Sequence, residues 1–365
     1  MIIKKIKANE LETFIFSNEY KASHVLPISR HRALSHIKNP RVKDEDVVLI
    51  MAYNEQNRLI GYLGIFADAI TIRETKHRAG WFSCLWVDEN TRGKGIAKTL
   101  LNEAFQAWNH QLLVTEFTSE AKSLYDRTGE FVDLKISNGV RGYLRSNLNE
   151  LLAPKHSFFL NNKKVIQAID AVLNLFHGMR LLLYNYSINH IKFEYVSQID
   201  SEIKELVEKY KTFTSRTADD LDWILKNPWI INAPFPDAFS KRYHFSSLNT
   251  NFHFYPVKIY NDQNELIAFL ILSVKGKNLK IPYCFFNPND IVKISKLIYA
   301  HMLSMKLNML TVFNPALANH IKLNKTPFYY KKDVKRHYII SKKFQEDIKQ
   351  EEVIFQDGDA DCAFS

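Results

Sequence analysis

The chain has 365 residues, of which 46% are hydrophobic and 13% aromatic. It is too long for one small core and too apolar for general disorder, so we expect two globular domains. Lys and Arg number 49 against 39 Asp and Glu, a net charge of +10 that favours anionic partners such as coenzyme A phosphates, nucleotide-linked sugars, nucleic acid or acidic lipid.

The three cysteines, Cys84, Cys284 and Cys362, lie far apart and lack the spacing of a metal site, so we expect no bound metal. The first residues carry charge but no continuous apolar run, so no signal peptide is evident. The longest apolar stretch, residues 165–186, is interrupted by polar side chains, which argues against a membrane span. These features predict a cytoplasmic protein.

Residues 2–6 alternate apolar and basic side chains, which predicts a strand, and a short helix is expected over 10–16. Residues 20–47 hold three histidines among several arginines. This region either grips an anionic acceptor or forms a basic, solvated helix pair. Next we expect a hairpin of strands at 47–53 and 59–67, and a polar loop over 70–80. The histidines are His24, His31 and His36, and the neighbouring arginines are Arg30, Arg32 and Arg41.

The stretch from Trp81 to Trp108 organises the first half. An apolar run ending at Val87 predicts a buried strand, a polar bend follows, and a helix opens near Ile96. Gly93 and Gly95 allow the backbone to approach a bulky anion closely, and the first N–H groups of the helix have no partner within it. The stretch therefore predicts an anion site at a helix start, before an apolar stripe formed by Ile96, Leu100, Leu101, Ala104 and Trp108.

This stretch resembles the acetyl-coenzyme A signature of the GCN5-related N-acetyltransferases (GNAT), which reads Arg or Gln, two residues, Gly, one residue, Gly or Ala. Residues 121–131 are similar to that family's second landmark, Ala…Leu-Tyr…Gly-Phe, here with Glu130 inserted before Phe131. The resemblance implies an α/β fold with a mixed sheet and acetyl-CoA as cosubstrate. It implies that the coenzyme is held by Trp86, Val87, Arg92, Gly93, Lys94, Gly95, Ile96 and Ala97.

The resemblance also implies catalytic roles. Tyr125 would protonate the departing thiolate, unless it is a core aromatic residue. Many family members carry a Glu early in the signature strand, but this strand has none, so the base stays open. Candidates are Glu116 and Ser83, with the loop residues His77 and Glu74 as alternatives. By strand alternation we expect Ser83 to share a face with Val87, and Cys84, an improbable nucleophile, to point away.

The second half repeats the order of elements of the first but lacks glycines at 286–290, where Pro288 removes a backbone donor. We therefore expect a GNAT-like copy without coenzyme; the alternative is an unrelated α/β domain. The expected domains are an acetyltransferase domain at 1–152, a helical linker at 153–192, the second copy at 193–343 and an acidic tail at 344–365. Pro154 marks the first boundary, and we expect the linker to be a helix pair broken at Gly178. The tail is expected to be free rather than docked on a basic groove. Expected elements of the copy are helices at 200–210, 218–226, 290–305 and 316–323 and strands at 255–260, 266–275, 279–285, 309–313 and 336–341.

Two functions remain open from sequence alone. The first is an N-acetyltransferase, a transferase whose acceptor is a small-molecule amine such as an amino sugar, a nucleotide sugar or an amino acid derivative, and which acts by direct attack on the thioester. The second is a non-catalytic acyl-CoA-binding or scaffold protein. We expect no nucleic-acid partner, and a monomer or homodimer.

Overall fold

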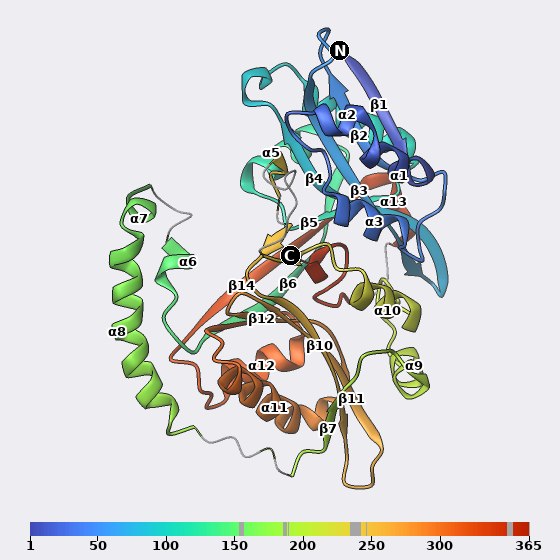
Figure 1. Cartoon of the computed structure of the whole chain (residues 1–365). Coiled ribbons are helices and arrows are strands. Elements are labelled where there is room, and N and C mark those ends of the chain that lie inside the picture. Colours follow the sequence, from blue (N-terminus) through green and yellow to red (C-terminus); the bar gives the residue numbers. More distant parts are fainter. Residues whose placement is uncertain are drawn as a thin grey trace. The chain divides into compact units, whose positions relative to one another are not determined.

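The computed structural model describes residues 1–152, 157–184, 188, 190–233, 242–245, 247–348 and 353–364 (Figure 1). The chain forms two compact units. Unit 1 comprises Met1–Ser137, Gln198–Phe252 and Arg336–Ser365, and unit 2 comprises Asn138–Ser197 and His253–Lys335. Each unit combines a mixed sheet with helices, which confirms the predicted α/β fold class.

Unit 1 is built on a sheet of long, largely buried strands. All neighbours pair antiparallel except β4 and β5, which are parallel. The order is β1 (Ile2–Lys7), β2 (Val47–Tyr53), β3 (Leu59–Ile72), β4 (Thr75–Val87), β5 (Leu112–Thr115) and the end of β14 (Tyr330–Ser341).

The prediction of a polar loop over residues 70–80 is wrong. Strands β3 and β4 continue through it as a paired hairpin, closed by Arg73 and Glu74 at positive φ. The physical reason is burial, because Ile70 and Ile72 lie in the interior and extend the apolar face of the sheet beyond the predicted strand end. His77 and Glu74 therefore belong to this hairpin, not to a loop over the cleft.

A β-bulge interrupts the β3–β4 ladder where the signature strand was expected to alternate regularly. Leu63 pairs with Leu85 and Ile65 with Phe82, so Ser83 and Cys84 together oppose one residue. Arg32 contacts both of their side chains, so both face the same side of the sheet. The expectation that Ser83 shares a face with Val87 is therefore wrong.

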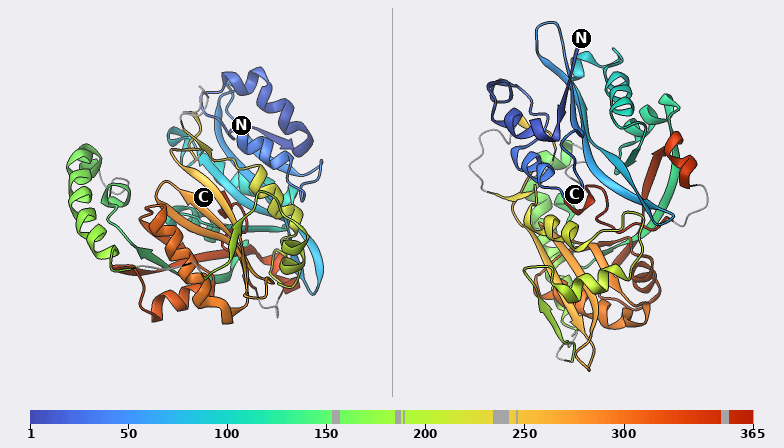
Figure 2. Two further views of the ribbon diagram at one scale, coloured as in Figure 1. Left: turned by 60° about the horizontal axis from the view of Figure 1, so that its bottom comes forward. Right: turned by 90° about the vertical axis from the view of Figure 1, so that its right-hand side faces the viewer.

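Helices cover both faces of the unit 1 sheet, as the blue and teal helices on either side of it show in the right view of Figure 2. One face is covered by α4 (Ile96–Ala107) and α5 (Ser119–Thr128), and the predicted apolar stripe of α4 is confirmed as core. The other face carries α1 (Ala8–Phe16), α2 (Asn18–Ala22) and α3 (Arg30–Ile37). The remaining elements of unit 1 are η1 (Glu89–Thr91), α9 (Ser201–Glu208), α10 (Ala218–Lys226), the short pair β8 (Ile231–Asn232) and β9 (Leu248–Asn249), α13 (Lys342–Gln345), η5 (Glu346–Ile348) and η6 (Cys362–Phe364).

Unit 2 repeats the arrangement around β4 and β5. Its strands β12 and β13 are parallel, like β4 and β5, and the connecting segment again contains one helix, α11. A helix, α12, follows β13, as α5 follows β5. The elements are β7 (Phe193–Tyr195), β10 (Phe252–Tyr260), β11 (Leu266–Lys275), β12 (Asn278–Phe286), η4 (Pro288–Asp290), α11 (Ile291–Ser304), β13 (Met309–Val312) and α12 (Pro315–Leu323), preceded by α6 (Leu148–Leu152), α7 (Ser157–Asn161) and α8 (Lys163–Leu181).

The predicted break at Gly178 is wrong, because α8 continues through it as one helix. A glycine inside a helix costs about 1 kcal/mol relative to alanine, which the other residues of a 19-residue helix outweigh. Pro154 lies outside the described residues.

Two strands, β6 and β14, begin in one unit and end in the other. Strand β6 (Phe131–Tyr143) begins in unit 1, and its residues Val140–Tyr143 pair with β13 in unit 2. Conversely, β14 begins in unit 2, and Tyr338–Ile340 pair with β5 in unit 1. The compact units therefore do not follow the contiguous boundaries expected at 152, 192 and 343, and residues 198–252 pack in unit 1.

The expected free tail is wrong for its described part, residues 353–364, which pack into unit 1. Asp357, Asp359 and Asp361 alternate along the segment, and each meets a buried arginine. Phe355 stacks on Tyr338, with ring centroids 3.9 Å apart. Charge pairing and aromatic packing together hold the segment in place, the arginines being Arg336, Arg216 and Arg32 in the same order.

Within the described residues, no helix combines the length and apolar character that crossing a bilayer requires.

Candidate active site

The turn before α4 has the backbone conformation that the sequence predicted. Gly93 and Gly95 adopt φ of 83° and 76°, the left-handed region that glycine favours. A Cβ at either position would meet nothing within 4 Å, so conformation rather than crowding selects glycine here. Gly95 is also the N-cap of α4 and has no side chain to cap the helix. The first N–H groups of α4 are therefore available to a ligand.

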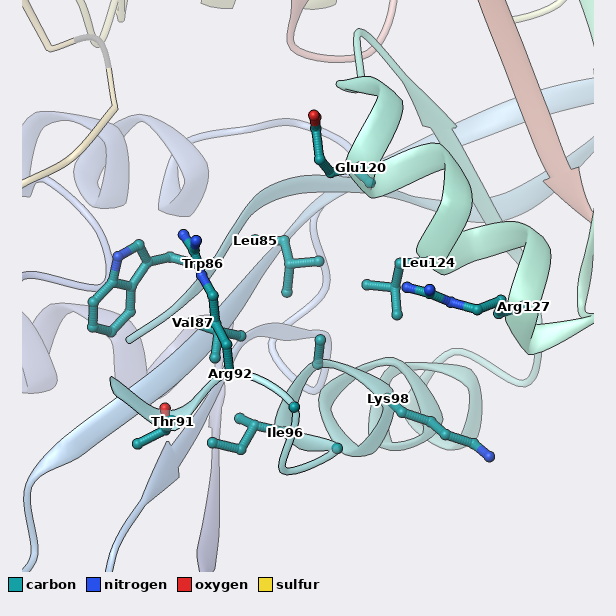
Figure 3. A pocket seen from close by; sticks show the side chains of 14 residues that line it. Leu85, Trp86, Val87, Thr91, Arg92, Ile96, Lys98, Glu120, Leu124 and Arg127 are labelled. Atoms are coloured by element: carbon teal, nitrogen blue, oxygen red, sulfur yellow. The ribbon is translucent and has the colours of Figure 1, made fainter. Parts of the chain in front are cut away.

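A pocket of about 720 Å³ lies beside this turn, between the end of β4, the start of α4 and α5 (Figure 3). All the predicted coenzyme residues line it except Lys94. In Figure 3 the side chains of Leu85 and Leu124 extend into the space between the two helices. The lining residues are Leu85, Trp86, Val87, Thr91, Arg92, Gly93, Gly95, Ile96, Ala97, Lys98, Glu120, Ala121, Leu124 and Arg127.

Three cationic side chains border the pocket, and the sequence interpretation had assigned only one of them. Arg92 was expected, whereas Lys98 on α4 and Arg127 on α5 were missed. Lys98 lies four residues after Lys94, in the first turn of α4. This spacing was the sequence signal that could have identified Lys98 as a site residue. Arg92 makes an exposed ion pair with Glu89 at 3.3 Å, which is worth little and can be exchanged for a ligand.

Tyr125 follows the pocket residue Leu124 in the chain, but its side chain points into the core of unit 1. Its side chain is 3% exposed and packs against the rings of Phe82, Phe117 and Phe131. Burial raises the pKa of its phenol above the ordinary value. Tyr125 does not line the pocket, although Leu124 does.

Glu116 is committed to an ion pair. Its carboxylate accepts a hydrogen bond from Nη2 of Arg336 at 2.8 Å. Arg336 also donates to the backbone oxygen of Asp357 at 2.6 Å and pairs with the Asp357 carboxylate. A carboxylate held by a buried arginine is stabilised in its charged form, which weakens it as a base.

Ser83 belongs to a polar cluster on the opposite face of β4 from the pocket-side core. Its hydroxyl donates a hydrogen bond to the Asp361 carboxylate, and Arg32 donates to that carboxylate at 2.7 Å. Arg32 also contacts Cys84 Sγ at 3.0 Å. Tyr243 closes the cluster, with its hydroxyl 3.3 Å from the same sulfur.

Cys84 sits in this cluster as an unreactive thiol. Burial raises its pKa, although Arg32 acts in the opposite direction. The thiol form therefore dominates at neutral pH, in keeping with its dismissal as a nucleophile.

Of these cluster residues, the sequence interpretation missed Asp361, whereas it had placed Arg32 in a region that could grip an anionic acceptor. The alternation of aspartates at 357, 359 and 361 was the available signal for Asp361. Tyr243 had been considered from sequence, together with Trp223, Trp229 and His244, as a residue of the second half that either lines the acceptor cleft or lies in the core. The structure places all four of them in unit 1.

Aromatic rings cover the same face of β4. Trp86 stacks on Tyr62 and on His244, with centroids 5.5 and 5.4 Å apart. Trp229 is buried against Phe364 of the C-terminal segment, at 3.9 Å. This face therefore offers aromatic walls around one carboxylate.

The histidine-rich region is neither a solvated helix pair nor an open anion site. His36 is buried, its pKa is lowered by desolvation, and its ring meets those of Phe66 and Trp229. The side chain of Arg41 is 8% exposed, and it pairs with Asp68 and Asp220. The charges of this region are used inside unit 1.

Comparison with solved structures defines the class of fold. A conserved protein from Enterococcus faecalis V583, described as a probable N-acyltransferase, is similar over 94% of this chain and 73% of its own, with a TM-score of 0.53 and 11% identity. Saccharomyces cerevisiae N-myristoyltransferase with bound myristoyl-CoA is similar over 93% and 78%, with a TM-score of 0.51 and 9% identity. The fold is therefore that of the N-acyltransferases. No curated protein sequence matches the chain.

A family model matches part of the sequence. Residues 45–129 match the family model described as the acetyltransferase (GNAT) domain, which includes the signature strand, the glycine turn and α5. The N-terminal part of this chain thus carries a GNAT domain, a member of an acyltransferase superfamily, and the resemblance stated from sequence is confirmed.

Proposed function

We propose that this protein is an acyl-CoA-dependent N-acyltransferase that transfers an acetyl group to the amine of a small molecule. The observation that carries the proposal is the pocket of unit 1, which meets the uncapped start of α4 at Gly93 and Gly95. An amino sugar, a nucleotide sugar and an amino acid derivative are the acceptor classes to test.

The residues present fit a coenzyme A thioester. Backbone N–H groups at the start of α4, with Arg92, Lys98 and Arg127, would hold its phosphates. Leu85 and Leu124 would contact the apolar part of its arm. When bound, the coenzyme supplies an activated acyl group.

The chain's own groups would manage the protons. The attacking amine must lose a proton as the N–C bond forms. If the amine approaches from the face of β4 opposite the pocket, the Asp361 carboxylate, reached through Ser83, would accept that proton. Tyr125 would return a proton to the thiolate as the C–S bond breaks. Glu116, the earlier candidate base, also pairs with a buried arginine, Arg336. Asp361 is preferred because it accepts a hydrogen bond from Ser83 of the signature strand.

Unit 2 would bind no coenzyme. Before α11 the chain forms the short helix η4 with Pro288 at its start, and the Asn287 side chain already accepts the N–H of Asn289. A backbone donor is lost to proline and another is used internally, so this turn offers less to an anion than the glycine turn of unit 1.

The test is release of free thiol from acetyl-CoA, butyryl-CoA and myristoyl-CoA in the presence of an amine panel. The proposal expects turnover with acetyl-CoA and one amine class, and none with Gly95→Asp. Turnover only with the longest chain would reject the acetyl donor while leaving acyl transfer in place.

A non-catalytic acyl-CoA-binding protein is the second candidate, favoured by the ion-paired Glu116 and by the buried position of Tyr125. It predicts saturable acetyl-CoA binding in calorimetry with no thiol release from any amine tested.

A further inference from the structure

Helix α8 of unit 2 exposes a row of large apolar side chains. The row is formed by Val165, Ile169, Val172, Phe176 and Met179 of α8 and by Leu183 just after its end, which are between 46% and 84% exposed. Leu173, Leu175 and Leu182 are exposed beside them. Within 165–183, all of which is described, Gln167 is the one polar residue among the exposed ones. The green helix α8 lies at the periphery of its unit in Figures 1 and 2.

Hydrogen bonds fix which side of α8 faces its own unit. Asp170 accepts from the Ser146 hydroxyl at 2.6 Å and from the Leu148 N–H at 2.8 Å. Asn174 accepts the Ser146 N–H at 2.7 Å and donates to its carbonyl at 2.9 Å. These contacts anchor the polar side of the helix.

The second half of α8 is anchored in the same way. Arg180 donates to the carbonyls of Pro327 and Leu144 at 2.7 and 3.1 Å, and the His177 ring stacks on Tyr329 at 4.2 Å. The polar side therefore faces the unit and the apolar side faces outward, the reverse of an ordinary surface helix.

The spacing of the exposed row is that of a helix partner. Its six residues are separated by four, three, four, three and four positions, the repeat of a heptad seam. A seam of this kind fits a second helix of matching length, because side chains at these positions insert between those of the partner.

The area of the row is that of an interface. With roughly 150–200 Å² for a large apolar side chain, the six residues of the row and the three exposed leucines beside it present on the order of 1,000 Å². The largest patch on a monomer is typically about 300–600 Å², and a stable interface uses about 800 Å² per partner.

We propose that α8 pairs with α8 of a second copy of this chain, antiparallel, to form a homodimer. The end charges set the direction. Lys163 and Lys164 are exposed at the start of α8, where a parallel pair would gather four lysines. An antiparallel pair places them at the partner's helix C-terminus, whose carbonyls favour cations.

A membrane surface fits the helix less well. Helices that lie on membranes carry Lys and Arg along their polar face. The polar face of α8 carries Asp170, Asn174 and Arg180, and these bond to unit 2.

Sedimentation velocity of the full chain tests the pairing. The wild type is expected to be a dimer at micromolar concentration, and Ile169→Glu/Phe176→Glu a monomer with an unchanged circular dichroism spectrum. Gln167→Glu, which adds one negative charge to α8 off the row, should remain dimeric. A monomeric wild type overturns the proposal, and so does a dimer that survives both glutamates.

Cysteine cross-linking tests the direction. Val165→Cys/Leu183→Cys should form intermolecular disulfides under mild oxidation, whereas Val165→Cys alone should not. Cross-linking of the single variant would indicate a parallel pair and contradict the proposal. A monomeric wild type that binds phosphatidylcholine vesicles would assign α8 to a lipid surface instead.

Discussion

The hydroxyl of Ser83 donates a hydrogen bond to the carboxylate of Asp361, although 278 positions separate the two residues in the chain. Residues 353–364 thus bring a carboxylate to the signature strand, and we propose that it takes the place of the Glu that this strand lacks. Arg32, buried beside it, pairs with the Asp361 carboxylate at 2.7 Å.

Asp361→Asn is therefore expected to lower kcat at least about tenfold while acetyl-CoA affinity stays within about twofold, because the amide keeps the shape but cannot accept the proton. Steady-state kinetics and calorimetry measure the two quantities. The control is Asp357→Asn, the same change at the first of the three alternating aspartates, which should keep near-normal kcat. Normal turnover in Asp361→Asn would remove this residue from the chemistry.

Gly95→Asp is expected to abolish acetyl-CoA binding and leave the fold intact. The new carboxylate would face the phosphates at the helix start, and the left-handed φ of 76° would be strained with a side chain present. Calorimetric titration decides this. Gly129→Asp is a matched control, since that glycine has a φ of 70° and equally open surroundings but does not line the pocket.

The intact chain is expected to bind one acetyl-CoA, because unit 2 lacks the glycine turn and has Pro288 in its place. Calorimetric stoichiometry measures this directly. Two sites per chain, or one site that persists in Gly95→Asp, would show that unit 2 binds the coenzyme.

Tyr125→Phe should lower kcat about a hundredfold with little effect on acetyl-CoA affinity, if its hydroxyl protonates the thiolate. Tyr283→Phe, a buried tyrosine of unit 2, is the control. Because Tyr125 is packed among phenylalanines, a variant with normal turnover and unchanged thermal stability would identify it as a core residue.

Docking of the C-terminal segment should depend on pH through Asp359. Burial raises the pKa of this carboxyl to about 6, while Arg216 and Thr214 act in the opposite direction. The unfolded value is about 4, so the folded state binds the proton more tightly. The contribution of Asp359 to stability is therefore complete below pH 4 and is lost as the pH rises through 6.

The measurement is the melting temperature of the wild type and of Asp359→Asn at pH 5 and pH 7.5. The wild type should lose stability relative to the variant at the higher pH, by at most roughly 3 kcal/mol. A difference between the two proteins that stays constant with pH would contradict this assignment.

The sequence predicted what depends on local order. The glycine turn, the apolar stripe of α4 and most strand positions follow from spacing along the chain, and the structure confirms them. Features set by distant partners were missed. The bulge at Ser83 and Cys84 arises from pairing with β3, and the buried position of Arg32 depends on Asp361. Neither leaves a periodic pattern in its own segment.

Because residues from the end of β14 onward belong to unit 1, the order of synthesis decides when this unit can be completed. When synthesis has reached only β13, strand β5 has already left the ribosome but its partner residues Tyr338–Ile340 have not yet been made. This edge of the sheet is then still unpaired. Arg32 and Arg216 at that stage also lack the aspartates that meet them in the finished protein. Unit 1, which forms the pocket and includes Met1–Ser137, therefore closes only after Tyr338–Ile340 and residues 353–364 have been made.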